Sequence, residues 1–203
     1  MVSILKEIQA VRKPKVYTFE EYLRREEKAV EKHEFFNGKI VKMPGGIDLH
    51  SEIAGNMIAT LKIAVRPLPR KYKVYTSDLK IRIEATDSGV YPDAIVICEQ
   101  PEYWQGRRDV IVNPLLIVEI LSPGTQAYDR MGKFELYKQL PSFQEYVLID
   151  VNKCAVETRF QEEPNLWRIR HETNIDNFVT LHALGVSISM ADIYEDIVFP
   201  LKK

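Results

Sequence analysis

The chain has 203 residues, of which 45% are hydrophobic and 28% charged, a composition that suits one globular domain and excludes a disordered or fibrous protein. Its formal net charge of −1 supplies no overall attraction to phosphate, so any nucleic-acid contact has to come from a local basic patch. The longest apolar run, Leu115 to Leu121, is interrupted by Glu119 and is far shorter than the roughly 20 residues of a membrane span.

The N-terminal segment and the cysteines indicate the cellular compartment. Residues 1–15 include an acidic residue and lack the succession of basic, long apolar and small residues that marks a secretory signal, so we expect a cytoplasmic protein. Cys98 and Cys154 are far apart and lie in apolar, strand-like runs. We therefore expect neither a disulfide nor a zinc site.

The first third of the chain predicts a helix, a hairpin and a second helix. A capping-box spacing at Thr18 to Glu21 opens a helical period that continues to a predicted end near His33. Asn37-Gly38 then separates two strand-like runs within Glu34 to Val41, which predicts a hairpin with a primed turn. A second helical period begins at His50 and is closed by Pro67 and Pro69.

The middle of the chain predicts three successive strands, Tyr72 to Ile83, Val90 to Cys98 and Val110 to Leu121. The last run is almost continuously apolar, which is typical of a central strand covered on both faces. A helix follows from Thr125 or Tyr128 to Pro141, with an apolar side that carries Met131, Phe134, Tyr137 and Leu140.

The remaining elements complete an α/β pattern. The run Glu145 to Asp150 predicts a strand, and its place after the helix predicts a right-handed parallel crossover. Short alternating runs from Ala155 to Val179 predict a β-meander, and Met190 to Ile197 a short terminal helix.

Glu119 is the most informative residue, because a lone carboxylate in the middle of a buried strand costs several kcal/mol unless a cation or a set of donors compensates it. Asp93 places a second carboxylate near the start of the preceding strand. If the two strands lie close together, the acids converge, and a hard divalent cation such as Mg²⁺ satisfies both. In the competing interpretation, Glu119 pairs with a buried lysine or arginine and Asp93 caps a turn.

Several motifs, in the same order, resemble the Uma-type restriction endonucleases, a family of the PD-(D/E)xK nuclease superfamily. The resemblance covers most of the chain and rests on Glu34 to Val41, Met43-Pro44, His50, Pro92-Asp93, Val118 to Pro123, Asp129-Arg130, Lys133, Tyr137 and Glu145 to Asp150. It implies a restriction-endonuclease-like mixed central sheet flanked by helices. We expect one domain over residues 1–203, with a core at about 18–151 and a C-terminal β extension at about 152–203.

The resemblance also implies a phosphodiesterase centre in which Asp93 and Glu119 hold Mg²⁺ or Mn²⁺. Glu34 is expected as a third carboxylate on the metal. The superfamily pattern has a lysine two residues after the second acid, where this chain has Leu121. We expect Lys133, on the inward side of the following helix, to replace it, the alternative being a lysine stem that flanks the core.

Three further residues are weaker candidates. His50 lies on the apolar side of the second helix, where a histidine is more often a core residue than a catalyst. Asp78 and Lys80 alternate on a predicted strand next to that of Asp93, and on one face they would neutralise each other.

The leading functional hypothesis is a metal-dependent endonuclease acting on DNA, and related nucleases imply a homodimer or a higher homo-oligomer. The alternative, motivated by Leu121 and the near-neutral charge, is a catalytically inactive nuclease-fold module for nucleic-acid binding or assembly. A third possibility is metal-dependent hydrolysis of another phosphoester, because the same two acids would serve.

Overall fold

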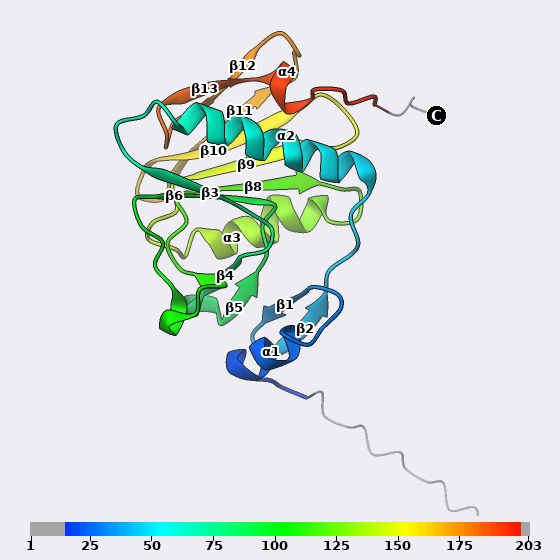
Figure 1. Ribbon diagram of the computed structural model, residues 1–203, viewed down its shortest axis with the longest axis vertical. Helices are drawn as coiled ribbons and strands as arrows, with labels where there is room; N and C mark the ends of the chain where they lie inside the picture. The colour runs from blue at the N-terminus through cyan, green and yellow to red at the C-terminus, as the bar shows by residue number, and fades with distance from the viewer. Residues whose placement is uncertain (1–14, 200–203) are drawn as a thin grey trace, which may run out of the picture.

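A six-stranded mixed sheet is the centre of the fold in the computed structural model, which describes residues 15–199 (Figure 1). Residues 1–14, in which the sequence predicts no secretory signal, and residues 200–203 lie outside the described part. The strand order is β11-β10-β9-β8-β6-β3, and β8 and β9 run parallel while the other neighbours are antiparallel. The strands are β3 (Tyr72–Thr76), β6 (Ala94–Cys98), β8 (Leu116–Leu121), β9 (Glu145–Asp150), β10 (Val156–Glu163) and β11 (Leu166–Glu172).

Two smaller sheets and a few helices complete the structure. A five-stranded sheet in the order β2-β1-β5-β4-β7 consists of β1 (His33–Phe36), β2 (Lys39–Lys42), β4 (Lys80–Ile83), β5 (Ser88–Val90) and β7 (Val110–Ile111). A C-terminal hairpin pairs β12 (Phe178–Leu181) with β13 (Val186–Ser189). The helices are α1 (Phe19–Glu26), α2 (Asp48–Val65), α3 (Phe134–Tyr137) and α4 (Met190–Ile193), with a π-helical segment η3 (Tyr128–Lys133) before α3 and short 3₁₀ turns η1 (Glu84–Thr86) and η2 (Trp104–Gly106).

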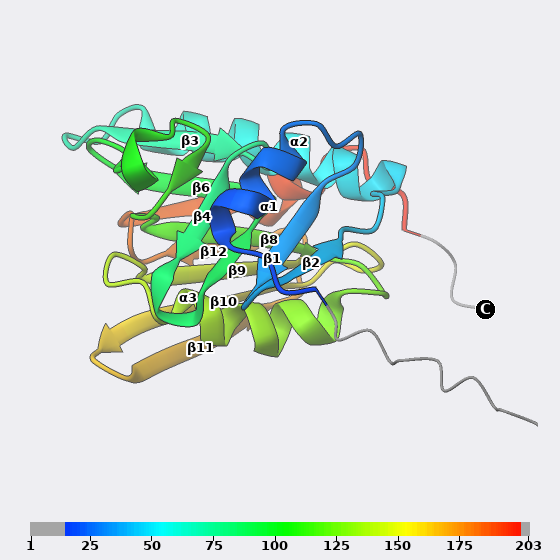
Figure 2. The same cartoon turned by 90° about the horizontal axis from the view of Figure 1, so that it is seen from below.

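Helices α2 and α3 lie on opposite sides of the six-stranded sheet, and the five-stranded sheet, with α1, lies on the same side as α3 (Figures 1 and 2). Because side chains alternate along a strand, every second residue of β8, such as Val118, packs in the core beneath α2. The residues between them, Ile117 and Leu121, pack in the core on the α3 side. This double burial confirms the prediction for the apolar run, and the alternation turns Glu119 toward η3 and α3.

The hairpin predicted from Asn37-Gly38 is confirmed. Both turn residues have positive φ, 44° at Asn37 and 82° at Gly38, as a primed turn requires. A side chain at the glycine would also collide with Val16. The turn therefore sets the register that places Glu34 opposite Val41.

The first helix is shorter than predicted. It ends at Glu26, whereas the helical period suggests an end near His33. His33 instead begins β1, and its backbone N–H donates to the Glu26 carboxylate at 2.8 Å while its carbonyl accepts from Tyr22 at 2.6 Å. These tertiary hydrogen bonds turn the chain back, so that the next residues pair in the small sheet.

Each of the three predicted middle strands is two strands that belong to different sheets. The first breaks at the turn between β3 and β4, the second at Pro92 between β5 and β6, and the third at Pro114 between β7 and β8. Apolar side chains alternate in the same way before and after each break, so the two-residue period of a strand does not reveal where one strand ends and the next begins. The two prolines do mark breaks, because proline has no N–H for a strand ladder.

In the helix before Pro141, the buried side differs from the predicted one. Its first turns are the π-helical η3, and Met131, expected in the apolar face, is 74% exposed. Asp129 and Lys133 are buried instead. A π-helix rotates fewer degrees per residue than an α-helix, so the face that a period of 3.6 residues predicts drifts around the axis. The parallel crossover that this helix makes from β8 to β9 is as predicted.

The C-terminal strands do not form one meander. β10 and β11 extend the six-stranded sheet, whereas β12 and β13 form a separate hairpin whose inward residues, such as Val179 and Ile188, pack in the core beneath α2. The terminal helix α4 ends at Ile193 rather than at Ile197. The division into a core and an extension stays a prediction. None of the helices within residues 15–199 is both long enough and apolar enough to span a membrane.

Glu145 anchors this C-terminal hairpin. Its carboxylate is buried at the start of β9 and accepts the backbone N–H groups of His182 at 3.0 Å and Ala183 at 2.8 Å. Burial raises the pKa of Glu145 from 4.5 to about 7, against the lowering effect of these two hydrogen bonds. Between those pH values the folded protein holds a proton that the unfolded chain has lost, so stability falls as the pH rises through this window.

Replacing Glu145 with glutamine is therefore expected to flatten the pH dependence of stability. The wild type should lose about 3 kcal/mol more of its free energy of unfolding between pH 4.5 and 8 than the variant does. Urea unfolding at several pH values measures the difference, and the other titrating groups are common to both proteins. Equal slopes for the two proteins would contradict the assignment.

Candidate active site

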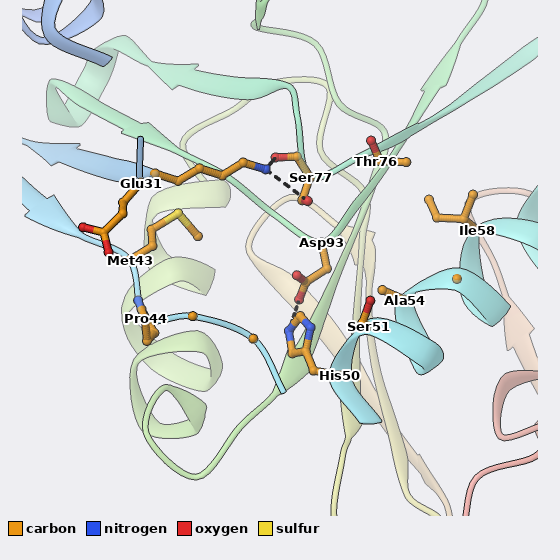
Figure 3. A pocket seen from close by; sticks show the side chains of 14 residues that line it. Glu31, Met43, Pro44, His50, Ser51, Ala54, Ile58, Thr76, Ser77 and Asp93 are labelled. Atoms are coloured by element: carbon orange, nitrogen blue, oxygen red, sulfur yellow. Dashed lines mark hydrogen bonds and ion pairs between the residues drawn. The ribbon is translucent and has the colours of Figure 1, made fainter. Parts of the chain in front are cut away.

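A pocket of about 550 Å³ opens where the β1–β2 hairpin, the first turn of α2 and the start of η3 meet beside β8. Five of the side chains predicted from the sequence line it, namely Glu34, His50, Asp93, Glu119 and Lys133. A second pocket of about 660 Å³ adjoins it and shares Asp93, His50 and residues 43–46 (Figure 3). Asp93 and His50 therefore stand between two adjoining cavities.

Asp93 is held at the junction of the two large sheets. It follows Pro92, where the chain leaves β5 and enters β6, and its backbone N–H donates to the carbonyl of Val118 at 3.1 Å. Its Oδ2 accepts the N–H of Ile120 at 2.7 Å and lies 3.3 Å from Nε2 of His50 (Figure 3). Among residues 15–199, no donor is bonded to Oδ1, which leaves this oxygen for a ligand.

Glu119 lies on the α3-facing side of β8 and is almost fully buried. Its Oε1 accepts hydrogen bonds from Nζ of Lys133 at 3.0 Å and from the hydroxyl of Tyr137 at 2.7 Å. Within the described residues, Oε2 has no hydrogen-bond donor. The competing interpretation of Glu119, a pair with a buried lysine, is thus also met, and its partner is the lysine predicted for the site.

Lys133 is the centre of a buried charge cluster. Besides Glu119, its Nζ lies 3.3 Å from Glu34 and 3.5 Å from Asp129. Burial lowers the pKa of Lys133, but the attraction of the three carboxylates outweighs it and places the pKa well above its usual range. Lys133 therefore stays a cation, which excludes it as a general base at neutral pH.

Three carboxylates around one ammonium leave a surplus of negative charge. Burial, and after it the repulsion from Asp93 and Asp129, raises the pKa of Glu119 well above its usual range despite the opposing effect of Lys133. Burial likewise raises the pKa of Glu34, whose Oε1 also accepts the N–H of Tyr91 at 3.2 Å. Either bound protons or a bound cation can neutralise such a surplus.

Leu121, at the position where the superfamily pattern has a lysine, is a core residue. It is buried on the same face of β8 as Glu119 and packs in the α3-side core with Phe134 and Tyr137. The ammonium that approaches the glutamate comes from η3 instead, fourteen residues along the chain from Glu119.

His50 lies in the first turn of α2 and points at Asp93 (Figure 3). The hydrogen bond to Asp93 raises the pKa of His50, and partial burial opposes this effect. His50 therefore helps the N–H of Ile120 to orient the Asp93 carboxylate, since both contact Oδ2.

Asp78 and Lys80 are not brought to the pocket, and the prediction that they share one strand face is wrong. The chain turns between β3 and β4, so Asp78 lies in the turn, is 83% exposed and pairs with Lys32 at 2.9 Å. Lys80 is buried in β4 and pairs with Asp109 at 3.0 Å. Each charge thus has its own partner.

Three other residues reach the site, although the sequence alone assigns them no role there. Asp129 is buried one helical turn before Lys133, and its (i, i+4) spacing is the one signal that connects the two. Tyr137, expected in the core and named among the motif residues of the resemblance, donates to Glu119. Tyr128 lines the pocket, and nothing in the local pattern separates it from an ordinary surface aromatic.

The oxygen donors fit a magnesium ion better than a softer metal. Within residues 15–199 there is no group of three or more histidine, cysteine, aspartate or glutamate side chains placed to enclose a metal. Magnesium does not require such a group, since it commonly binds through one or two carboxylates and keeps water or substrate oxygens as its other ligands. Asp93 and Glu119 line one pocket, and Oδ1 and Oε2, which have no donor among the described residues, would be those two ligands.

The architecture recurs in a solved structure described as a "putative nuclease belonging to DUF820 from Anabaena variabilis ATCC 29413". The two share 21% sequence identity with a TM-score of 0.68, over 88% of this chain and 97% of that one. This similarity concerns the fold, and it confirms the predicted class of mixed sheets flanked by helices with C-terminal strands.

The family is shown by the sequence itself. Residues 19–191 match the model of the Uma2 family, described as "Putative restriction endonuclease". Two relatives come from Synechocystis sp. (strain ATCC 27184 / PCC 6803 / Kazusa). The uncharacterized protein slr1290 is 35% identical over 89% of this chain and 92% of its own, and the uncharacterized protein sll1609 is 37% identical over 67% and 76%. The chain therefore belongs to the Uma2 family. The description of this family places it among the nucleases, which are hydrolases that act on nucleic acids.

Proposed function

We propose that this protein is a Mg²⁺- or Mn²⁺-dependent endonuclease that hydrolyses phosphodiester bonds in DNA. The observation that carries the proposal is that Asp93, directly before β6, and Glu119, in β8, line one pocket. In each carboxylate one oxygen accepts hydrogen bonds from the protein, and the other has no donor among the described residues. Lys133 supplies the positive charge that the superfamily lysine would supply at the position of Leu121.

The chain's own groups divide the work of hydrolysis, in which water is added across a phosphorus–oxygen ester bond. A bound Mg²⁺ would polarise the phosphate and lower the pKa of a bound water. Ile120 and His50 orient Asp93, and Tyr137 orients Glu119, so neither acid has to reorganise when substrate enters. Lys133, as a permanent cation, offsets negative charge that develops on the phosphate.

Two further residues contact the groups of this centre. Glu34, which the resemblance implies as a third ligand, instead shares Lys133 with Glu119, and because the described residues contain no group of three such side chains around one point, the proposal places the metal on Asp93 and Glu119 alone. His50 is a positioning residue for Asp93. Asp78 and Lys80 have no part in the proposed mechanism.

Metal dependence tests the proposal directly. The protein should cleave plasmid or single-stranded DNA with Mg²⁺ or Mn²⁺ and stop when EDTA removes the metal, because two carboxylates alone repel a phosphate. A crystal soaked in Mn²⁺ should show an anomalous peak beside Asp93 and Glu119. Cleavage that is unchanged in EDTA, or a peak absent from this pocket, would count against the assignment.

A second candidate function is a catalytically inactive nuclease-fold module for nucleic-acid binding or assembly. It is favoured by one observation, that Lys133 and Tyr137 already provide partners for Glu119 without a metal. Calorimetric titration with Mn²⁺ separates the two candidates, because only the nuclease requires binding at the acids. The homodimer expected from related nucleases stays a prediction.

A further inference from the structure

The ring of Tyr128 belongs to the lining of the pocket and packs against neighbouring residues. The residue begins η3 and is 38% exposed, yet its ring meets the ring of Phe36 edge-on, with centroids 5.9 Å apart. The ring also lies against Gly132, where a Cβ would come within 2.5 Å of Cδ2 of Tyr128. Glycine at this position therefore allows the ring to lie close to the helix backbone.

This ring adjoins the charged centre. Nζ of Lys133 lies 6.0 Å from the centroid of Tyr128, and both residues line the pocket that contains Asp93 and Glu119. The volume of about 550 Å³ is in the range of pockets that enclose small organic ligands. A phosphate at the two acids would thus have a rigid, half-exposed aromatic surface within the same cavity.

The charges of the lining do not suit an intact duplex. Of the two lysines in it, Lys133 is surrounded by carboxylates and Lys42 pairs with Glu31 at 2.6 Å. No arginine is among the described residues that line this pocket, whose rim includes the exposed apolar side chains of Val41 and Ile47. Duplex binding relies on many lysine and arginine contacts to phosphates, whereas single strands also bind by stacking their bases on aromatic rings.

We propose, on the basis of the nuclease function proposed above, that the site takes single-stranded or locally unpaired nucleic acid, and that a base of the bound strand stacks on Tyr128. Tyr128 is then a specificity-determining residue, since it recognises the flat face that a base exposes only outside a duplex. Phe36 and Gly132 hold the ring in the stacking position.

Binding to fluorescein-labelled oligonucleotides tests this inference without requiring cleavage. Fluorescence anisotropy is measured with Ca²⁺ for single-stranded DNA, single-stranded RNA of the same sequence and the DNA duplex, and the two single strands show which polymer is preferred. We expect single strands to bind more tightly than the duplex. Tyr128→Leu should weaken single-strand binding about tenfold or more, the effect of losing one stacked base, while Tyr128→Phe should keep it.

Two further variants make the result specific. Met131→Ala alters an exposed neighbour that does not line the pocket and should bind like the wild type. Gly132→Ala should displace the ring and weaken single-strand binding as Tyr128→Leu does, and thermal unfolding verifies that both variants are folded. A duplex bound as tightly as the single strand, or a folded Tyr128→Leu variant that binds normally, would overturn the inference.

Cleavage assays distinguish this failure from that of the nuclease proposal. If wild type and Tyr128→Leu cut duplex plasmid equally well in Mg²⁺, the single-strand inference is wrong and the nuclease stands. If no substrate is cut with any metal but binding depends on Tyr128, the nuclease proposal is wrong and the stacking site stands.

Discussion

Asp93→Asn is expected to slow metal-dependent DNA cleavage by about a hundredfold to a thousandfold while leaving the protein folded, the scale of loss seen when a preorganised electrostatic group is removed from an active site. Asparagine has nearly the same shape, and its amide oxygen can still accept the N–H of Ile120. What is lost is the negative charge that would hold the metal. The change therefore separates the charge of Asp93 from its structural hydrogen bond.

The chain provides a matched control in Asp78→Asn. Asp78 is another aspartate predicted from the sequence, but it lies in the exposed turn between β3 and β4 and pairs only with Lys32 among the described residues. Cleavage rates of the three proteins are compared under single-turnover conditions with Mg²⁺, and Mn²⁺ affinity is measured by calorimetry. Activity of Asp93→Asn within tenfold of wild type, or an equal loss in Asp78→Asn, would remove Asp93 from the mechanism.

Lys133→Met is expected to have the largest effect on stability. Methionine retains the apolar stem but removes the ammonium that, among residues 15–199, faces Glu34, Glu119 and Asp129. Breaking a buried charge cluster in this way costs about 3–5 kcal/mol, because the remaining charges have no partner. Without the lysine the pKa values of Glu34 and Glu119 rise further, so the loss should grow as the pH rises.

Added Mg²⁺ should restore part of that stability, because a ligand that binds only the folded state stabilises it. Lys80→Met is the matched control, since Lys80 is also buried and pairs with one carboxylate, Asp109, outside the pocket. Urea unfolding with EDTA or Mg²⁺, at pH 6 and pH 8, compares both variants with the wild type. A Lys133→Met protein that gains no more from Mg²⁺ than Lys80→Met does would show that no metal replaces the ammonium.

The position of Asp93 in the proposed mechanism depends on the break between β5 and β6. Pro92 interrupts one apparently continuous strand, so β5 joins the small sheet while β6 joins the large one. Asp93 lies at this crossing point, where its carboxylate can reach the N–H of Ile120 beyond the last paired residues of β6 and β8. The same proline that ends one ladder thus positions the acid.

Local patterns in the sequence were sufficient to predict secondary structure and burial wherever the signal lies within a few residues. The Asn37-Gly38 turn, the period of helix α2 and the double burial of β8 each follow from conformational preference or from hydrophobic alternation. Glu119 was recognisable for the same reason, because a charge inside a buried strand needs compensation wherever the strand lies.

The partners of these residues were decided only by the tertiary structure. Lys133 and Glu119 meet across 14 residues of sequence, and Asp93 and Ile120 across 27. Which side of η3 is buried depends on a π-helical turn that a period of 3.6 residues does not describe, and the separate partners of Asp78 and Lys80 follow from a turn that alternation does not reveal. Periodicity encodes whether a side chain is buried, whereas sheet pairing and helix phase decide which buried charges touch.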